Sequence, residues 1–484
     1  MRAFVLYGVV FGMVLGWGFT GSARAVLPEG NNGIAARHPH DTGIEQDSNV
    51  IFVEKFDESS LTTLFNRWED RKETNTMSFS TDVPAGAGDT HSLLMTHTGG
   101  QGSGPHLYRR LLPGYDQVYA RFYVKFDPAC YSISHMGTGL GGYNPPTSWP
   151  QGGAGVCPSG SDRFSTHLEP FGSSWAWAFY TYWKDMRNSP PIPPGAYWGN
   201  TFTWGVPGRT VVKGRWICVE IMVKTNNPVS DSNGEQAWWI DGQLIRYGGQ
   251  IVSWTGKGFP KGTWTWDKFS PSPSGQPFEG FQWRTVDQLR VNFLWTYIYI
   301  TTAPSGYVSK VWFDNIVVAK EYIGPIVTQL MPVAEAGNDR AIYEAYGCTL
   351  DGSASTDANT YSWQQVGGKT VVLTGANTAK PSFTTPTVAS VEEAQLRFRL
   401  TVTNSTGQDS DEVGVRVKLR CDANGDDRVD SADLAIWQEH YDPLGRNANT
   451  TETGDFNGDG KVDSADLGVW QREYNPAGLP GGSP

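Results

Sequence analysis

Asp422-Ala-Asn-Gly-Asp-Asp-Arg-Val-Asp-Ser-Ala-Asp-Leu-Ala-Ile-Trp-Gln-Glu-His-Tyr441 is repeated 33 residues later as Asp455-Phe-Asn-Gly-Asp-Gly-Lys-Val-Asp-Ser-Ala-Asp-Leu-Gly-Val-Trp-Gln-Arg-Glu-Tyr474. Thirteen of the 20 aligned positions are identical. Self-similarity of this kind indicates one supersecondary unit that is used twice. Each copy reads as an acidic loop followed by one short helix, because the Leu and Trp after the loop stand three residues apart.

The repeat spaces its oxygen-bearing side chains as a calcium-binding loop does. In each copy they stand at loop positions 1, 3, 5, 9 and 12, and position 7 offers its backbone carbonyl. Calcium is a hard cation that prefers about six to eight oxygen ligands. We therefore predict two bound Ca²⁺ ions, with Asp422, Asn424, Asp426, Arg428, Asp430 and Asp433 as the first ligand set and Asp455, Asn457, Asp459, Lys461, Asp463 and Asp466 as the second.

Two positions depart from the usual EF-hand pattern. Asp427 occupies position 6 of the first loop, where Gly normally permits the sharp turn, whereas Gly460 keeps the rule in the second loop. Asp tolerates a left-handed backbone better than most residues, so we expect a strained but usable first loop. Position 12 is Asp in both copies instead of Glu.

Two loop–helix units with Asp at position 12 closely resemble a type I dockerin module over residues 421–475. The resemblance implies a protein-binding module that grips cohesin domains and tethers carbohydrate-active enzymes. In that family, positions 10 and 11 of each loop help to choose the partner. These are Ser431, Ala432, Ser464 and Ala465, and the pair is the same in both copies, which suggests that either face binds the same partner.

Residues 333–418 read as short alternating strands separated by turns. Examples are Thr360-Tyr-Ser-Trp-Gln-Gln365, Leu396-Arg-Phe-Arg-Leu-Thr-Val402 and Glu412-Val-Gly-Val-Arg-Val417. The segment resembles a polycystic-kidney-disease-type (PKD) immunoglobulin-like domain, which implies a seven-strand sandwich. We expect Trp363 in its core and expect the domain to be a spacer without chemistry of its own.

The largest module spans residues 49–326 and carries sixteen of the 20 tryptophans. Its strands alternate an aliphatic face with a polar one, as in Arg121-Phe-Tyr-Val-Lys-Phe126 and Trp216-Ile-Cys-Val-Glu-Ile-Met-Val-Lys224. The run Arg163-Phe-Ser-Thr-His-Leu-Glu169 likewise aligns Arg, Ser, His and Glu on one face. This pattern predicts an antiparallel sandwich in which one sheet presents a functional polar face.

Three segments of this module, Ile51-Phe-Val-Glu-Lys-Phe-Asp57, Asn233-Gly-Glu-Gln-Ala-Trp-Trp-Ile-Asp-Gly242 and Val311-Trp-Phe-Asp-Asn-Ile-Val-Val318, resemble the concanavalin-A-like jelly roll. Polysaccharide lyases, laminarinase-type hydrolases and some lectin modules share that fold. The fold class is therefore mainly β: an N-terminal β-jelly-roll sandwich, an immunoglobulin-like β-sandwich and a small α dockerin with two EF-hand-like calcium loops. Asp57 and Asp314 could also meet beside a structural calcium ion, although a plain hydrogen-bonding role is favoured.

A jelly-roll lyase neutralises a uronate carboxylate, abstracts the adjacent proton and protonates the leaving oxygen, and Arg, His and Tyr suit these tasks. The candidate catalytic residues are Arg121, His167, Tyr180 and Tyr182, and further candidates on nearby strands are Tyr297, Tyr299, His106, Arg109 and Arg110. The Glu-x-Asp-x-x-Glu motif of the laminarinase-type hydrolases is absent. A hydrolase would have to use Glu169 and Glu220, the strand carboxylates that the sequence offers.

These features predict a secreted, modular carbohydrate-active protein of polysaccharide catabolism, with a lyase on a uronate-containing polymer favoured over an O-glycosyl hydrolase. The alternative from another class is a non-catalytic carbohydrate-binding or scaffold protein, which the many tryptophans support because indole rings stack on sugars. The net charge of −11 is concentrated after residue 326. This acidity argues against a nucleic-acid partner but not against an anionic sugar in residues 49–326.

The N-terminus begins with a positive charge and the apolar run Ala3–Phe19, and ends in the small-residue site Ala23-Arg-Ala25. The pattern predicts a signal peptide over residues 1–25, hence secretion, with no membrane span after cleavage. We expect a linker over residues 26–48 and a flexible tail over residues 476–484.

Five cysteines suit an exported chain, in which disulfides can form. Cys348 with Cys421 and Cys130 with Cys157 are plausible pairs. Cys218 would then be a buried thiol on a strand.

Overall fold

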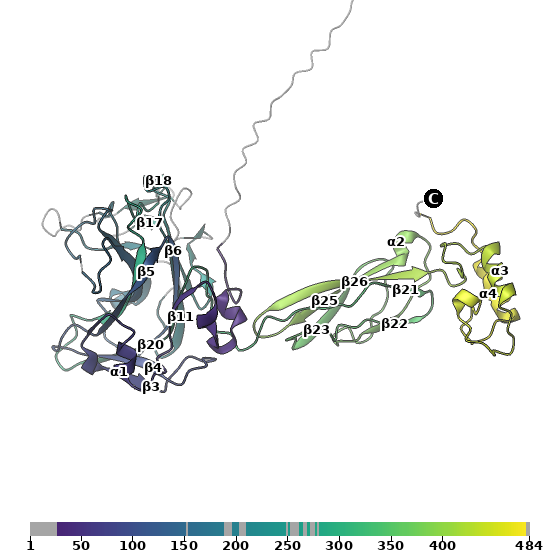
Figure 1. Ribbon diagram of the computed structural model, residues 1–484, viewed down its shortest axis with the longest axis horizontal. Coiled ribbons are helices and arrows are strands. Elements are labelled where there is room, and N and C mark those ends of the chain that lie inside the picture. Colours follow the sequence, from purple (N-terminus) through teal and green to yellow (C-terminus); the bar gives the residue numbers. More distant parts are fainter. Residues whose placement is uncertain are drawn as a thin grey trace, which may run out of the picture.

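The computed structural model describes residues 27–480, except for residues 152, 188–195, 203–209, 248–249, 252–260, 265–268, 272–275 and 278–279. The predicted signal peptide lies outside the described residues. Figure 1 shows three parts in a row: a large β sandwich, a slender middle domain and a small C-terminal domain that contains α3 and α4. Of the residues that the structure describes, 38% are in strands and 12% in helices, so the prediction of a mainly β protein is confirmed.

The large module contains two antiparallel sheets. Sheet I has the order β13-β12-β11-β6-β20-β4-β3, with β1 paired to β20. Its strands are β1 (Val50–Glu54), β3 (Met77–Ser80), β4 (Ser92–Thr98), β6 (Gln117–Phe126), β11 (Trp216–Lys224), β12 (Glu235–Ile240), β13 (Gln243–Leu244) and β20 (Val308–Ala319). Sheet II has the order β10-β9-β8-β7-β19-β5-β2. Its strands are β2 (Asp70–Lys72), β5 (His106–Tyr115), β7 (His135–Tyr143), β8 (Arg163–Phe171), β9 (Ala176–Tyr182), β10 (Asn200–Phe202) and β19 (Val291–Tyr299).

Short elements connect and flank these sheets. Strands β14 (Arg246–Tyr247) and β15 (Gln250–Ile251) form one pair, and β16 (Lys261–Trp264), β17 (Phe269–Pro271) and β18 (Gln276–Pro277) form a small sheet. The helical turns are η1 (Ile34–Arg37), η2 (Pro39–Asp41), η3 (Ile44–Gln46), α1 (Leu61–Phe65), η4 (Thr74–Thr76) and η5 (Gly172–Ser174).

The apolar core fills the space between the two sheets. Alternate residues of β6 and β11, such as Phe122, Val124 and Val219, are fully buried there, as the period of two predicts. The adjacent Trp238 and Trp239 belong to different clusters, because successive side chains of β12 point to opposite faces. Sheet I therefore packs apolar side chains on both of its faces.

Residues 27–48 cover the apolar cluster that contains Trp239, on the outer face of sheet I. The prediction that residues 26–48 form a linker is therefore wrong. Ile34 and Ile44 of this segment are buried against Tyr119 and Trp239 on the outer face of sheet I. The backbone N–H of Ile34 donates to the carbonyl of Tyr322 at 3.0 Å. The segment is an integral layer of the module because this sheet face is too apolar to be left in water.

Two polar residues lie beneath this layer, on neighbouring strands of sheet I. The fully buried Arg121 forms an ion pair with the equally buried Asp41 and donates to the carbonyl of Asn315 at 3.1 Å. Opposite it, the Glu220 carboxylate accepts the backbone N–H groups of Ile323 and Gly324 at 2.8 and 2.9 Å. Both residues have structural roles: Arg121 ties sheet I to Asp41 and Asn315, and Glu220 ties it to the segment after β20.

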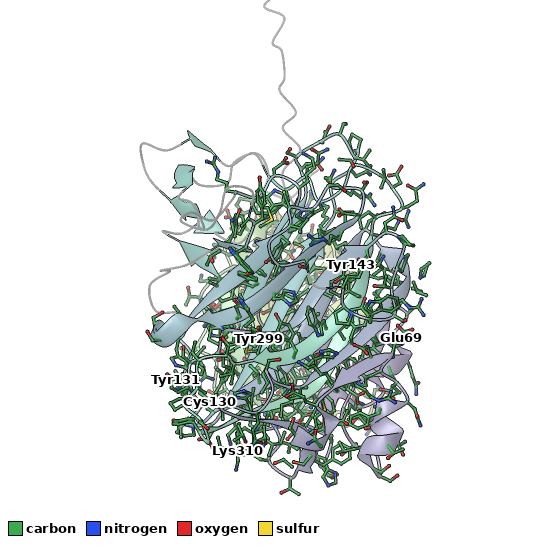
Figure 2. All side chains as sticks on the ribbon, turned by 90° about the vertical axis from the view of Figure 1, so that its left-hand side faces the viewer. Glu69, Cys130, Tyr131, Tyr143, Tyr299 and Lys310 are labelled. Atoms are coloured by element: carbon green, nitrogen blue, oxygen red, sulfur yellow. The ribbon has the colours of Figure 1, made fainter. Side chains whose placement is uncertain are left out.

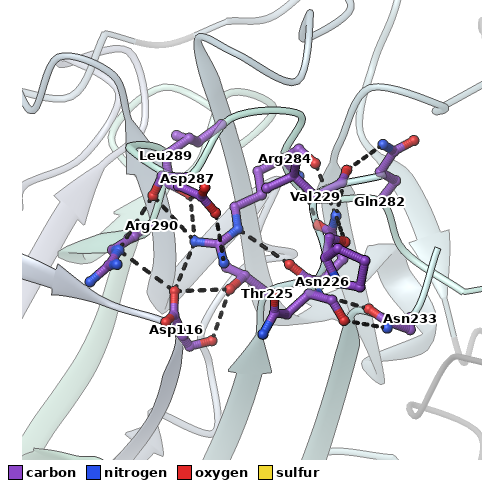
Figure 3. A network of polar contacts seen from close by, with 12 residues as sticks. Asp116, Thr225, Asn226, Val229, Asn233, Gln282, Arg284, Asp287, Leu289 and Arg290 are labelled. Carbon is purple, nitrogen blue, oxygen red and sulfur yellow. Dashed lines mark hydrogen bonds and ion pairs between the residues drawn. The ribbon is translucent and has the colours of Figure 1, made fainter. Parts of the chain in front are cut away.

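Arg284 fixes the entry to β19 at one end of the sandwich (Figure 3). Its buried guanidinium donates to Asp116 at 2.8 Å, in the turn between β5 and β6, and to the carbonyl of Asn226 after β11 at 3.3 Å. The Asn226 side chain in turn accepts the Arg284 N–H and donates to the Arg284 carbonyl, each at 3.0 Å. The network ties β19 of sheet II to two strands of sheet I.

The middle domain, residues 333–418, has six strands in the described chain, against the seven expected. They are β21 (Arg340–Tyr343), β22 (Gly347–Thr349), β23 (Thr360–Gly367), β24 (Ser382–Thr384), β25 (Gln395–Thr403) and β26 (Gln408–Lys418), with helix α2 (Val391–Ala394) before β25. The sheets are β21-β26-β25-β23 and β22-β24. Trp363 is buried in the core between them, as expected.

The C-terminal domain, residues 419–480, repeats a loop and a helix. Helices α3 (Ser431–Glu439) and α4 (Ser464–Glu473) follow the two acidic loops, and η6 (Thr451–Thr453) precedes the second. Asp430 and Asp463 are the N-caps of the two helices, each with a capping box to the Asp three residues on. The tail is not free up to residue 480, because Leu479 packs against the apolar clusters of both the middle and C-terminal domains.

All five cysteines are unpaired, so the expected disulfides are wrong. Cys348 and Cys421 belong to the separate cores of the middle and C-terminal domains. The thiols of Cys130 and Cys157 donate to the carbonyls of Tyr131 and Lys184 at 3.5 and 3.3 Å. Cys218 is a buried strand thiol, as predicted.

The helices of the described chain are short: α4, with 10 residues, is well below the length that crosses a bilayer. Within residues 27–480, apart from the gaps given above, no helix qualifies as a membrane span.

The buried pair of Arg121 and Asp41 yields a stability prediction. Replacing Arg121 by Met leaves an unpaired buried carboxylate, so we expect the free energy of unfolding to fall by about 3–5 kcal/mol in urea titrations followed by tryptophan fluorescence. The control is Arg110→Met, which removes an exposed pair with Glu69 and should cost less than about 1 kcal/mol. Equal losses in the two variants would contradict the role given to Arg121.

Candidate functional site

A cleft of about 410 Å³ lies on the face of sheet II that points away from the core. Strands β5, β7, β8, β9 and β19 supply most of its lining. The lining residues are Lys72, Ser103, Gly104, Pro105, His106, His135, Tyr143, Pro150, Gly153, Ala154, Arg163, Ser165, His167, Tyr180, Tyr182, Trp198, Trp295, Tyr297, Ile298 and Tyr299. Figure 2 labels two of them, Tyr143 and Tyr299.

The strand period explains why β8 and β9 dominate the cleft. Arg163, Ser165 and His167 alternate along β8 and share the face that the sequence pattern assigned to them. On β9, Tyr180 lies opposite His167 and Tyr182 lies opposite Ser165. The structure therefore brings three of the four candidate catalytic residues together.

Arg121 is the exception, and its prediction as a cleft residue is corrected. It belongs to sheet I, faces away from sheet II and has no exposed surface. Glu220 shares that location, so it cannot act with Glu169 across the cleft. The sequence shows that these residues occupy polar strand faces, but not which sheet each strand joins.

Arg109 and Arg110 also do not line the cleft, although they share β5 with His106. Arg110 pairs with Glu69, and the guanidinium of Arg109 lies 4.1 Å from the ring centre of Phe52. Tyr297 and Tyr299 on β19 do line the cleft, as does His106.

His135, which was not predicted from the sequence, lines the cleft and pairs with a buried carboxylate. Its Nδ1 lies 3.1 Å from Oε1 of Glu169, and the Glu169 side chain is 2% exposed. Burial acts to lower the pKa of His135, but the charge and hydrogen bond of Glu169 outweigh this and raise the pKa. The ring also contacts that of Tyr180 in a tilted arrangement, with 4.3 Å between centroids. The sequence carried one signal for His135: it shares a strand face with Gly137 and Gly139, which leave space beside it.

His167 forms part of the cleft floor as a neutral imidazole. Burial, and to a smaller extent His135, lower its pKa to about 3. A Cβ atom on Gly139 would lie 1.9 Å from its Nδ1, so the neighbouring strand needs glycine there for the ring to fit. The edge of the ring contacts Trp295 and Tyr297.

Tyr180 and Tyr182 form a hydroxyl pair beside these histidines. Their oxygens are 3.2 Å apart, and burial raises the pKa of both phenols. Both are therefore protonated at neutral pH and can donate a hydrogen bond or a proton to a bound ligand.

The cleft has a cationic character. Lys72, Arg163 and His135, whose pKa is raised, line it together with the neutral His167 and with His106, which lies 2.8 Å from Asp70, and none of the described residues that line it is Asp or Glu. Trp198 and Tyr299 are 38% and 39% exposed, which leaves ring faces open for stacking. The arrangement suits a sugar that carries carboxylates.

The calcium loops combine buried carboxylates with oxygen donors. Asp422 and Asp433 are fully buried, and Asp422 accepts the backbone N–H groups of Gly425 and Asp427 at 2.7 and 2.9 Å. Burial, and then the charge of Asp433, raise the pKa of Asp422. Buried like charges of this kind are costly unless a cation compensates them. The donor set thus fits calcium, which would supply that charge.

The second loop repeats this geometry around Asp455 and Asp466. Asp455 accepts the N–H groups of Gly458 and Gly460, each at 2.8 Å, and Asp466 accepts that of Asn457 at 2.9 Å. The predicted ligands Asn424, Asp426, Asp430, Asp459 and Asp463 lie in these loops at the same relative positions, and Arg428 and Lys461 stand at position 7. No three His, Cys, Asp or Glu side chains of the described chain gather as a metal centre by themselves, so a site here also needs the Asn and backbone oxygens.

The two halves of the C-terminal domain hold each other reciprocally. The indole of Trp437 on α3 donates to the carbonyl of Asp463 at 3.0 Å, and that of Trp470 on α4 donates to the carbonyl of Asp430 at 3.1 Å. The expected partner-binding residues Ser431, Ala432, Ser464 and Ala465 lie in the first turns of the two helices, where both alanines are exposed. Both faces are thus open.

Asp57 and Asp314 of the large module take different roles. One oxygen of Asp57 accepts the backbone N–H groups of Thr90 and His91 at 2.9 and 3.1 Å. Asp314 is fully buried, and burial together with the charge of Asp89 raises its pKa. Hydrogen bonding accounts for Asp57, whereas a calcium ion beside Asp314 stays a prediction.

Comparisons with solved structures give distant likenesses, and no curated protein sequence matches the chain. The alginate lyase vAL-1 from Chlorella virus is 14% identical, with 57% of this chain and all of that chain covered and a TM-score of 0.38. The titin M3 domain is 18% identical, with 18% and 95% covered and a TM-score of 0.14. The binding domain of botulinum neurotoxin serotype D/C VPI 5993 is 8% identical, with 75% and 73% covered and a TM-score of 0.28.

Two family models match the C-terminal third. A model of a PKD domain matches residues 336–417, and the model described as "Dockerin type I domain" matches residues 420–475. Both resemblances predicted from the sequence are confirmed. The chain thus carries a PKD domain in its middle and, directly after it, a type I dockerin domain.

Proposed function

We propose that the large module is a polysaccharide lyase that cleaves a uronate-containing polymer in the cleft of sheet II. The observation that carries the proposal is the composition of that cleft. It combines a tyrosine pair, a neutral histidine, a carboxylate-supported histidine and further cations, with no Asp or Glu among the described lining residues. These are the groups that an elimination next to a carboxylate requires.

The reaction assigns a task to each group. His135 and Arg163 hold the uronate carboxylate and make the adjacent carbon more acidic. The neutral His167 accepts the proton from that carbon, and the electron pair left behind forms a carbon–carbon double bond. The neighbouring carbon–oxygen bond breaks as the leaving oxygen takes a proton from the Tyr180–Tyr182 pair, so that charge and atoms balance.

A glycoside hydrolase on the same fold fits this cleft less well. Hydrolysis of a glycosidic bond uses two carboxyl groups about 5–10 Å apart on either side of that bond. Glu169 is buried behind His135, and Glu220 lies in the other sheet. A non-catalytic carbohydrate-binding protein is the second candidate, because the exposed rings of Trp198 and Tyr299 could hold a sugar without cleaving it.

The C-terminal domain sets the context of this activity. Type I dockerin domains bind calcium and cohesin proteins, and proteins that carry them are typically extracellular and carbohydrate-active. For this chain we propose secretion, one calcium ion in each loop, and tethering to a cohesin partner through the Ser-Ala pairs. We also propose a third calcium ion, beside Asp314. Metal analysis after dialysis tests this: three ions per chain are expected, and two would contradict the third site.

The central test incubates the full chain with a panel of polyuronates and neutral polysaccharides. We expect an ultraviolet absorbance from unsaturated sugar ends with at least one polyuronate. New reducing ends without that absorbance indicate a hydrolase, and binding without either product indicates a binding module. Tyr180→Phe and His167→Ala should each lower kcat by about 10²- to 10⁴-fold, the usual share of acid–base catalysis. Tyr307→Phe, an exposed tyrosine of the same module outside the cleft, is the matched control.

The pH profile tests the role of His135. Because Glu169 raises the pKa of His135, the cation persists to higher pH, and activity that needs it is lost as the pH rises through the raised pKa. In Glu169→Gln this support is removed, so the alkaline limb of kcat/KM should move to lower pH. Glu220→Gln, a buried carboxylate of the opposite sheet, should leave the limb in place. An unmoved limb in Glu169→Gln would count against the assignment.

Partner binding tests the two equivalent faces of the dockerin domain. Ser431→Asp or Ser464→Asp alone should leave cohesin binding intact, since the other helix offers the same Ser-Ala pair. The double variant should lose binding in surface plasmon resonance while its calcium content stays at that of the unaltered chain. Retained binding in the double variant would refute the proposed faces.

A further inference from the structure

The junction between the middle and C-terminal domains is almost without a linker. Strand β26 ends at Lys418, and the first calcium loop begins at Asp422. Of the residues between them, Leu419 and Cys421 are already buried in the core of the C-terminal domain. Figure 1 shows the C-terminal domain at the end of the middle domain that points away from the large module.

Side chains of the middle domain reach the first calcium loop and the segment that precedes the second. Arg416 on β26 forms an ion pair with Asp427 of the first loop. The hydroxyl of Tyr343, at the end of β21, donates to Glu452 at 3.0 Å and lies 3.4 Å from the carbonyl oxygen of Asp422. Tyr343 thus bridges loop position 1 to the segment that leads into the second loop.

Contacts at the junction and at the end of the chain add to this interface. Arg420 donates to the carbonyl of Phe456, in the second loop, at 2.6 Å. After α4 the chain returns to the middle domain, where the carbonyl of Pro480 accepts the N–H of Val391 at 3.1 Å. Leu479 and Val388 each pack against the apolar clusters of both domains. The C-terminal domain is therefore held at its entry and at its exit.

The interface explains the one irregular residue of the first loop. Asp427 stands at position 6 with φ of 62°, a left-handed backbone that Gly adopts without strain. Gly460 takes the same position in the second loop with φ of 81°. A Cβ atom on Gly460 would meet nothing within 4 Å. At position 427 the side chain instead reaches Arg416, which gives the departure from Gly a physical reason.

We propose that the first calcium loop is also the docking element that fixes the dockerin domain onto the PKD domain, so that calcium binding and docking stabilise each other. The loop is shared by both events, since Arg416 and Tyr343 contact Asp427 and Asp422 of the same loop that would hold the ion. If docking onto the PKD domain raises the affinity of the loop for calcium by some factor, calcium binding must strengthen docking by the same factor. The PKD domain is then a calcium-dependent support that holds the cohesin-binding helices in one orientation, and this role is independent of the lyase activity.

Hydrogen exchange of the full chain, followed by mass spectrometry, tests the coupling. Adding calcium to the chelator-treated protein should slow exchange in the calcium loops and also in residues 340–346 and 416–420 of the PKD domain and junction. In Asp427→Gly the loops should still gain protection, whereas the gain at residues 340–346 should shrink. Protection confined to the loops of the unaltered chain would overturn the proposal.

Calcium titration by calorimetry supplies the reciprocal measurement. Arg416→Ala should weaken calcium binding at one of the two sites by about two- to fivefold, the range expected for loss of a partly exposed ion pair. The matched control is Arg399→Ala, because Arg399 forms a similarly exposed pair with Glu412 in the same sheet, remote from the loops in sequence. Equal calcium affinities in the two variants would also overturn the proposal. Neither measurement depends on the cleft, so a failed lyase assay leaves this test unaffected.

Discussion

The two sheets of the large module share one apolar core, and each strand of the sandwich buries alternate residues in it. Phe122 and Val219 of sheet I meet Leu168 and Leu294 of sheet II in that core. The remaining residues of each strand must then point outward. On sheet II they form the cleft, and on sheet I they contact residues 27–48 and the segment after β20. The same constraint thus produces a functional face and a structural one.

Two buried glutamates show how the outer face of each sheet determines the role of its residues. Glu169 and Glu220 lie on central strands with almost the same pattern, and both are nearly inaccessible. Glu220 accepts two backbone N–H groups, and burial raises its pKa to about 7. Glu169 instead supports His135 at the cleft. The difference arises from what covers each sheet: a layer of chain on one side and open solvent on the other.

The C-terminal domain uses a few residues for several tasks at once. Position 9 of each loop, Asp430 or Asp463, is a predicted calcium ligand, the helix N-cap and, through its carbonyl, the acceptor for the opposite tryptophan. The residues that combine these tasks are identical in the two copies of the repeat. Asp427, where the first loop departs from the glycine of the second, lies where the loop meets another domain.

Local patterns in the sequence determined much of this protein. The spacing of oxygen side chains identified both calcium loops and the dockerin domain, and the period of two placed Tyr180 and Tyr182 on one face of their strand and His167 on the polar face of another, because loops and strands obey short-range geometry. Only the tertiary structure decided that Arg121 belongs to the opposite sheet, that His135 stands on Glu169, that residues 27–48 form a layer, and that the cysteines stay apart. The physical reason is that each of these facts depends on which strands and segments pair across long sequence separations, and alternation along a strand carries no information about its neighbours.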